Sequence, residues 1–335
     1  MTLEGVLGPN SWVDDATGMP VETPQALCAA GDERLLFSSG NAVLTIGKWG
    51  RKPELWCEFD QPVTALCVSP GGMIGVGMAD GTLAVRDTVG QTVDGWAAPE
   101  GLASVADCIF LSEDEIAIVD SGYRAGEDML AIAPWDDIPR GQVVAIDRNG
   151  ASRRLADNLH CPTGVARDAA GGLILTLLER ASVVEMSGKV RQSGYPAYLG
   201  RIRSTDTGYL ISCLSRRDPL IEFLKTETEF VAEMKAKIEP RHWISPRANP
   251  EFSHDFPIEL GATRLFGDIK PWAPSFSYGL VIETDKNFIP TGSAHSRANG
   301  SRHAISDAVS WNGDVIAVSK ASGELLRFSF GRDAE

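Results

Sequence analysis

The sequence predicts an all-β fold, a six-bladed β-propeller with a helical and irregular insertion in the region of its fifth blade. Two observations predict this fold. Short apolar strands bounded by Gly, Asp or Ser turns recur along the chain, with almost no helix between them. They recur as six repeats of about 40–50 residues, the length of a four-stranded blade. A blade cannot bury its own two faces, so we expect the ring to close as one domain over residues 1–335.

The repeat is clearest where segments can be laid over one another. TPQALCAAGDERLLFSSGNAVLTI, QPVTALCVSPGGMIGVGMADGTLAVRD and CPTGVARDAAGGLILTLLERASVVEM each hold a proline, a glycine turn, an apolar strand, a second turn and another strand. The six repeats begin near Thr23, Gln61, Val105, Cys161, Ser193 and Ile305. A sandwich or jelly roll is the competing all-β architecture, but it does not explain a sixfold recurrence.

One segment departs from the strand pattern. DPLIEFLKTETEFVAEMKAKIEP, which begins at Asp218, places apolar residues at helical spacing, and Pro240 ends the run. The following stretch is rich in proline and aromatic residues, so we interpret residues 218–272 as an insertion. It is either a lid over the central cavity or a flap that packs on the ring, and the sequence leaves both open.

Composition narrows the class of partner. The net charge is −14 and the isoelectric point is about 4.9, which disfavours nucleic acid and anionic membranes because both require a basic face. No apolar run is long enough for a membrane-spanning helix, and the first residues do not have the pattern of a secretion signal. We therefore expect a cytoplasmic protein, a monomer or weak homo-oligomer, with a small molecule as its partner.

The six cysteines form no close C-x-x-C pair, which disfavours a zinc site. Cys28, Cys67 and Cys108 lie in apolar strand-like runs. We expect buried, reduced thiols at these positions.

From about Leu102 to Phe330 a series of motifs follows in a familiar order. The motifs are IVDSG, RGQVVAIDRNGASRRLADNLHCPTGVARDAAGG, SGYPAYLGRIRSTDTGYLISCLSRRDPLIEFL, YGLVIETDKNFIPTG and ISDAVSWNGDVIAVSKASGELLRF. Their order resembles the strictosidine-synthase-like family, which is related to the gluconolactonase and paraoxonase propellers. The resemblance implies a propeller with its chemistry at the mouth of the central channel.

The resemblance breaks down at the calcium ligands. In calcium-binding relatives these oxygen ligands come from the channel-facing starts of inner strands. The matching places here fall on Gln25, Ala106, Asp107, Thr163, Ala197 and Tyr198. Only Asp107 keeps a carboxylate, and calcium requires six to eight oxygen ligands. We therefore expect neither metal nor cofactor. For the metal-free synthases the resemblance implies a glutamate in the last blade that does acid–base work. The matching place here is Ser306, beside Asp307, so this acid–base chemistry does not carry over either.

Three residues are candidates for catalysis at the channel mouth. Asp107 is a candidate general base if apolar surroundings raise its pKa, or else a structural aspartate at a strand start. His303 is a candidate for proton transfer near neutral pH, or else an exposed loop residue. Tyr198 is a candidate hydrogen-bond donor to an oxyanion, or else it fills the space of a missing ion.

Further residues at the mouth are candidates for substrate binding, with Arg302 suited to a carboxylate. These candidates are Gln25, Asp120, Thr163, Arg302, Ser306 and Asp307. The loop from Gly122 to Gly141 borders the pocket, and its Met129 and Trp135 either line an apolar wall or pack on the blade.

The leading functional hypothesis is a metal-independent hydrolase or lyase acting on a small organic metabolite at the channel mouth. Two alternatives remain. One is a non-catalytic propeller that binds a metabolite, and the other is a calcium-dependent lactonase of the gluconolactonase type with ligands at other positions.

Overall fold

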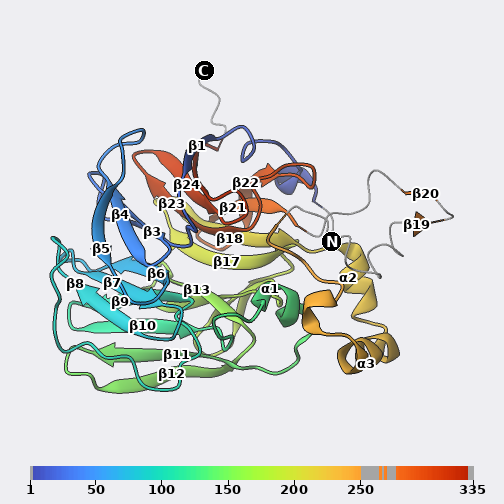
Figure 1. Cartoon of the computed structure of the whole chain (residues 1–335), viewed down its shortest axis with the longest axis horizontal. Helices are drawn as coiled ribbons and strands as arrows, with labels where there is room; N and C mark the ends of the chain where they lie inside the picture. The colour runs from blue at the N-terminus through green and yellow to red at the C-terminus, as the bar shows by residue number, and fades with distance from the viewer. Residues whose placement is uncertain (1–2, 250–263, 266–267, 270–276, 331–335) are drawn as a thin grey trace.

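The computed structural model describes residues 3–249, 264–265, 268–269 and 277–330. Six antiparallel sheets stand in a ring around a central channel, which confirms the predicted six-bladed propeller (Figure 1). The innermost strand of each blade contacts the innermost strand of the next, and the contacts run all the way round the ring. These inner strands are β2, β6, β9, β13, β17 and β23.

The first three blades follow one another in the N-terminal half of the chain. Blade one consists of β2 (Leu27–Ala29), β3 (Leu35–Ser39), β4 (Ala42–Ile46) and β5 (Glu54–Glu58). Blade two consists of β6 (Val63–Val68), β7 (Ile74–Met78) and β8 (Leu83–Arg86), and an isolated bridge from Arg86 to Thr92 marks its outer edge. Blade three consists of β9 (Asp107–Ser112), β10 (Glu115–Asp120), β11 (Gly141–Asp147) and β12 (Ser152–Leu159).

The remaining blades complete the ring. Blade four consists of β13 (Pro162–Arg167), β14 (Leu173–Leu177), β15 (Ser182–Glu185) and β16 (Val190–Ser193). Blade five consists of β17 (Ala197–Ser204), β18 (Gly208–Arg216), β21 (Gly279–Asp285) and β22 (Pro290–Ser296). Blade six consists of β23 (Ile305–Trp311), β24 (Asp314–Ser319), β25 (Glu324–Phe328) and the N-terminal strand β1 (Thr17–Pro20).

The hydrophobic core is divided among the blade interfaces. Six clusters of buried apolar side chains occupy the six interfaces between neighbouring blades. Strand β7 shows why the strands are apolar on both faces, since all five of its residues are buried. A Cβ at Gly77 would lie 2.2 Å from Cγ1 of Val105, so the small residue permits the close approach of blade two to blade three.

The chain folds helically where the periodicity predicts. Between β18 and β21 lie α2 (Pro219–Leu224), α3 (Thr228–Lys237), the 3₁₀ turn η3 (Pro240–His242) and the short strands β19 (Arg264–Leu265) and β20 (Asp268–Ile269). The rest of the predicted insertion beyond Asn249 lies outside the described residues. No helix in the described part of the chain combines the length and the apolar character needed to cross a bilayer.

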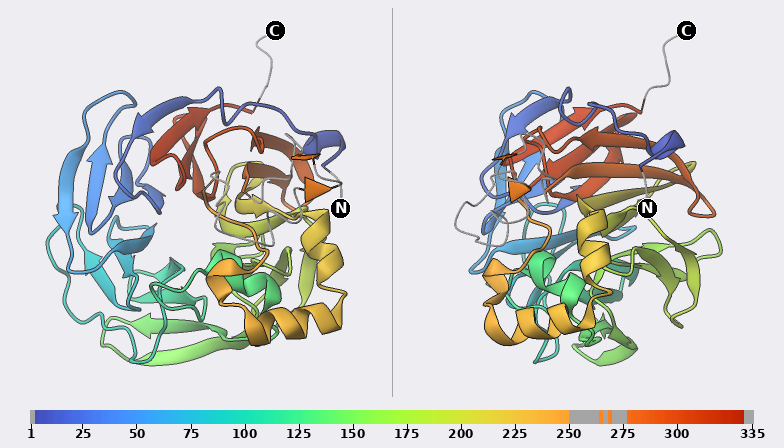
Figure 2. Two further views of the ribbon diagram at one scale, coloured as in Figure 1. Left: turned by 45° about the vertical axis from the view of Figure 1, so that its right-hand side comes forward. Right: turned by 90° about the vertical axis from the view of Figure 1, so that its right-hand side faces the viewer.

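The first part of the insertion packs on the loop of blade three. That loop carries α1 (Met129–Ile132) and η2 (Ala133–Trp135), and Figure 2 shows α2 and α3 beside α1. Trp135 is buried against Ile221 and Met234, and its indole Nε1 donates to Oγ of Ser245 at 2.8 Å. Trp135 therefore anchors the insertion.

The thiols are placed as predicted. All six cysteines are free, and all except Cys57 are buried. Cys28, Cys67 and Cys108 lie in the inner strands of three successive blades, and the Sγ atoms of Cys67 and Cys108 are 3.2 Å apart.

Ring closure depends on the N-terminal segment. Strand β1 pairs antiparallel with β25, from Thr17 opposite Arg327 to Pro20 opposite Glu324. Another short 3₁₀ turn, η1 (Gly5–Leu7), precedes it and contacts β22. Arg302 holds the connecting segment, because its guanidinium donates to the carbonyls of Val13, Asp14 and Ala16. Its Nε also donates to Glu324 at 3.1 Å. Arg302, predicted from the sequence to bind a substrate carboxylate, therefore binds a carboxylate of the protein and secures the ring.

Replacing Arg302 with methionine should lower the free energy of unfolding by about 2–3 kcal/mol, because several charge-assisted hydrogen bonds to the closing segment are lost. Urea denaturation followed by tryptophan fluorescence measures this change. Arg153→Met is the matched control, since its side chain is 60% exposed beside Glu115 and the change should stay below about 0.5 kcal/mol. Equal midpoints for the two variants would show that Arg302 does not secure the closing segment.

Candidate functional site

An arginine occupies the centre of the ring. Arg201 and Arg203 are two positions apart on β17, so both side chains point to the same side of the strand, into the channel. The Arg201 guanidinium is 4% exposed and donates to four backbone carbonyls, those of Gln25, Thr64, Ala106 and Ser306. The bonds are 2.7 Å to Gln25, 3.1 Å to Ser306 and 2.8 Å from Nη2 to Ala106. Each carbonyl adjoins or begins the inner strand of a different blade.

Blade four is linked to the same part of β17 through a side-chain hydroxyl. The Thr163 hydroxyl donates to the carbonyls of Leu199 at 2.9 Å and Gly200 at 3.0 Å, which immediately precede Arg201. The other five blades are therefore linked to β17 of blade five. Four of them bind the Arg201 guanidinium, and blade four binds the carbonyls of Leu199 and Gly200.

A second layer of charge lies toward the opposite mouth of the channel. Arg203 binds Asp107 through two bonds of 2.7 and 2.9 Å, and its Nη2 also donates to Asp307 at 3.0 Å. Burial opposes the charge on Arg203, but the Asp107 and Asp307 carboxylates outweigh it and raise the pKa of Arg203 well above its usual range. Arg201 lies 3.5 Å from Asp107 and 3.6 Å from Asp307, so two cations balance two anions. We call these four residues the axial plug.

The axial plug fixes the role of two predicted site residues. Asp107 and Asp307 are fully buried, and each also accepts a backbone N–H from the neighbouring blade, that of Val165 or Leu27. Neither carboxylate lines the cavity above Arg201. The structure thus places Asp107 in an ion pair that links blades. This agrees with the structural aspartate that the sequence offered as the alternative to a general base.

The channel residues do not fit a calcium ion on the axis. The carbonyl oxygens that would offer ligands there accept N–H bonds from Arg201, whose fixed positive charge would repel a dication. Within the part of the chain that the structure describes, no group of three His, Cys, Asp or Glu side chains is arranged to hold a metal.

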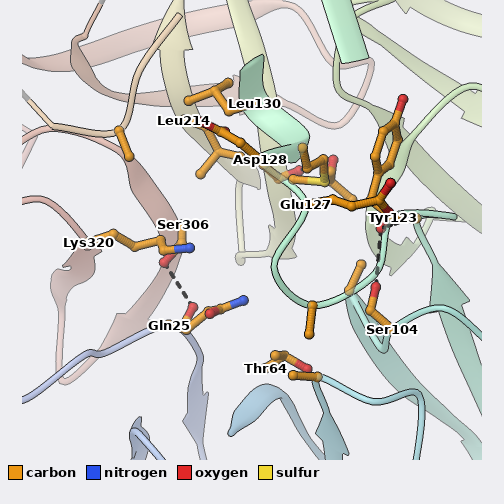
Figure 3. A pocket seen from close by; sticks show the side chains of 18 of the residues that line it. Gln25, Thr64, Ser104, Tyr123, Glu127, Asp128, Leu130, Leu214, Ser306 and Lys320 are labelled. Carbon is orange, nitrogen blue, oxygen red and sulfur yellow. Dashed lines mark hydrogen bonds between the residues drawn. The ribbon is translucent and has the colours of Figure 1, made fainter. Parts of the chain in front are cut away.

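A cavity of about 310 Å³ is lined in part by Arg201 and lies on the side of the ring that carries the loop of blade three, and we call it the cavity above Arg201. Figure 3 shows its wall. Gln25, Thr163 and Ser306, predicted from the sequence, line it together with Thr64 at the starts of the inner strands. The loop from Ser121 to Leu130 forms the facing wall, and Leu214 and Ala248 complete it. Ala248 brings the insertion to the edge of the cavity.

The polar atoms of the wall are mainly acceptors. The hydroxyl of Ser306 donates to Gln25 O at 2.9 Å and that of Thr64 to Val105 O at 2.6 Å, so both hydrogens are committed to the backbone. Their oxygens keep lone pairs for a ligand. Glu127 and Asp128 add carboxylates on the facing wall.

Lys320 adds an amine to the wall and was not among the residues predicted from the sequence. It follows the last residue of β24 and lies on the wall beside Ser306 (Figure 3). Its side chain is open to the cavity, and no described residue forms a hydrogen bond or ion pair with its ammonium group. Surrounding protein lowers the pKa of Lys320, and the nearby charge of Arg201 lowers it further, with Asp128 acting weakly against both. A signal existed in AVSK, where a lysine follows a buried strand at the end that faces the channel mouth.

The remaining predicted residues lie outside this cavity. Tyr198 is fully buried among Tyr123, Leu130 and Cys161, and burial raises its pKa above the usual range. It fills space behind α1, although no described group hydrogen-bonds its hydroxyl. Asp120 is a structural residue that accepts N–H bonds from Ala103 at 3.1 Å and Gly122 at 2.9 Å.

His303 is buried as well, and its contacts do not include Asp107. Its Nε2 donates to the carbonyl of Arg297 at 2.7 Å, so Nδ1, which is 3.0 Å from Oγ of Ser277, accepts. Burial lowers the pKa of His303. The predicted acid–base pair of Asp107 and His303 is not brought together.

The opposite mouth holds a second cavity of about 240 Å³, lined by Arg203 and the thiols of Cys28, Cys67 and Cys108. Burial raises the pKa of Cys28 to about 12 and that of Cys67 well above its usual value. The thiols of Cys28 and Cys67 therefore stay protonated near neutral pH, which makes them poor nucleophiles.

Replacing Arg201 with methionine should lower the free energy of unfolding by about 3–5 kcal/mol, because four buried carbonyls lose their donor and Asp107 and Asp307 keep only one of their two cations, Arg203. Arg201→Lys keeps the charge but offers fewer donors, so we expect a smaller loss. Denaturant midpoints measure both. If the methionine variant does not fold, the lysine variant still decides, since wild-type stability in it would contradict a structural role for the guanidinium.

Stability should also fall in acid. Burial, with the nearby charge of Arg297, lowers the pKa of His295 to about 4, against about 6.5 unfolded. The contribution of His295 to the free energy of unfolding is therefore complete above about pH 6.5 and decreases as the pH falls toward 4. By pH 5 the loss is about 2 kcal/mol. Urea midpoints measured between pH 7 and 5 should shift less in His295→Gln, whose amide can still bond Tyr278 and Ser293. Identical pH dependence in the two proteins would contradict this assignment.

Comparisons with known proteins support the fold alone. No family model and no curated protein matches the sequence. Among solved structures, the chain is similar to the PQQ-bound aldose sugar dehydrogenase from Streptomyces coelicolor, with 10% identity, a TM-score of 0.54 and coverage of 94% of this chain and 96% of that one. It is also similar to a candidate gluconolactonase, with 12% identity, a TM-score of 0.53 and coverage of 94% and 92%. Likeness at this identity shows a shared propeller fold, and the strictosidine-synthase-like resemblance rests on the sequence motifs.

Proposed function

We propose that this protein is a metal-independent hydrolase or lyase that acts on a small hydroxylated organic molecule in the cavity above Arg201. The observation that carries the proposal is Lys320, an amine without a partner among the described residues, which lies beside Ser306 in a cavity that also holds the acceptors Thr64, Glu127 and Asp128. A lowered pKa leaves a larger share of the amine neutral at a given pH, and the neutral amine can act as a base or a nucleophile.

The size and polarity of the cavity support the class of ligand. A volume of about 310 Å³ lies at the lower end for small-molecule sites. Lone pairs on Ser306 and Thr64 and the carboxylates of Glu127 and Asp128 favour a ligand that donates hydrogen bonds. Hydroxyl groups meet this requirement.

The floor of the cavity supports metal independence. The guanidinium of Arg201 donates its hydrogen bonds to backbone carbonyls, so it contributes positive charge but no hydrogen bond to the ligand. The proposal therefore assigns acid–base work to Lys320 instead of Asp107, which is paired with Arg203.

A non-catalytic metabolite-binding propeller is the second candidate. One observation favours it: no described carboxylate or hydroxyl hydrogen-bonds Lys320, so no acid–base pair is preformed. The two candidates share the cavity and differ in turnover.

Thermal shift with a set of sugars, sugar acids, lactones and hydroxyaldehydes, in the presence of chelator, tests the proposal. A ligand at one hundred times its Kd should stabilise the wild type by about 2.7 kcal/mol. Ala125→Trp should weaken binding at least about tenfold, because Ala125 is exposed and lines the cavity. Ala170→Trp is the matched control, on an exposed turn away from the cavity.

Mass spectrometry of the hit after incubation then separates the two candidates. A changed ligand identifies an enzyme, and an unchanged one identifies a binding protein. No stabilisation by any compound, equal binding to both tryptophan variants, or binding only with calcium would overturn the proposal.

A further inference from the structure

We propose that the Lys320 amine forms an imine with the carbonyl carbon of a hydroxylated aldehyde or ketone, so that the reaction is a lyase reaction through a covalent intermediate. This inference rests on the proposed function and names its substrate class.

The first argument is position. The base of Lys320 is fixed, since its backbone N–H donates to Ala304 O at 3.1 Å and the preceding Ser319 Oγ donates to His303 O at 2.9 Å. The rest of the side chain extends into the cavity beside Ser306 and opposite Glu127 and Asp128 (Figure 3). A rigid base and an unpaired end are what a nucleophile requires, because it must reach the ligand without first breaking an ion pair.

The second argument is charge. Attack on a carbonyl needs the neutral amine, and both the surrounding protein and Arg201 favour that form of Lys320. Arg201 cannot lose its own proton, so this influence is constant over the physiological pH range.

The third argument is ligand orientation. Substrate hydroxyls find acceptors at Ser306, Thr64, Glu127 and Asp128. A carbonyl group cannot donate to these atoms, and the amine that lies beside the acceptor Ser306 is that of Lys320, whereas Arg124 belongs to the exposed loop of the facing wall. The polar pattern therefore directs the carbonyl end of the ligand toward the amine.

The chemistry balances without any further reactant. The neutral amine attacks the carbonyl carbon, the C=O electron pair moves to oxygen, and a proton passes from nitrogen to oxygen to give a carbinolamine. Loss of water gives the protonated imine. A carboxylate of the facing wall, Glu127 or Asp128, then takes the proton of a hydroxyl on the β-carbon. The bond between the α- and β-carbons breaks, and its electron pair moves toward the imine nitrogen. A second carbonyl compound leaves, and the enamine that remains on Lys320 takes the proton from the carboxylate at its α-carbon to become a protonated imine. Addition of water to this imine releases the first carbonyl product and restores the amine of Lys320.

Reductive trapping tests the inference on the full-length protein. Glyceraldehyde or dihydroxyacetone is added with cyanoborohydride at neutral pH, and the modified peptides are quantified by mass spectrometry. We expect the Lys320 peptide to be modified at least about tenfold faster than the exposed Lys286, and Ala125→Trp to remove this difference. Lys320→Arg should lose the fast adduct and any turnover while it keeps the charge, and Lys286→Arg should change neither.

The outcomes separate this inference from the proposed function. Ligand stabilisation in the thermal-shift assay without preferential modification of Lys320 would overturn the imine and leave the cavity as a binding site. Turnover that survives Lys320→Arg would overturn the imine as well. If no compound stabilises the protein and Lys320 reacts no faster than Lys286, the proposed function fails together with it.

Discussion

The guanidinium of Arg201 is the constraint on which this propeller depends. A ring of six sheets leaves backbone carbonyls converging on the axis at the starts of its inner strands, and these need donors when water is excluded. One planar cation with five N–H groups serves carbonyls from four blades. Because the guanidinium is covalently part of β17, a cation is present on the axis at any metal concentration. It also has a fixed plane and direction, which a spherical ion lacks.

The charge of Arg201 has consequences in both directions along the axis. Toward one mouth a buried cation needs anions, and Asp107 and Asp307 supply them, with Arg203 restoring neutrality. Toward the other mouth Arg201 borders the cavity, and its positive charge lowers the pKa of Lys320 there. The residue that holds the blades together thus also favours the neutral form of the Lys320 amine. Structure and candidate chemistry are coupled through one side chain.

The sequence predicted what is local or periodic. The blade rhythm and the helices around Leu220 and Met234 follow from the spacing of apolar residues. The family resemblance indicated Gln25, Thr163 and Ser306, and all three line the cavity. The sequence did not predict pairings between repeats. Asp107 was rightly placed at an inner strand start, but its partner Arg203 comes from another blade, 96 positions along the chain. Two arginines at alternate positions in the otherwise apolar strand YLGRIRS were the available signal, since both must point to one side.

The carbonyl oxygens that converge on the axis explain why a cation is needed there. Their partial negative charge destabilises the ring unless a cation or hydrogen-bond donors pair with it. Arg201 meets that need from within the chain but, unlike a metal with an open coordination position, has no vacant donor for a substrate. Arg201 therefore offers a ligand charge but no hydrogen bond at the axis. Under the proposed function the reacting group comes from the wall of the cavity, where the end of β24 places the amine of Lys320 beside the axis.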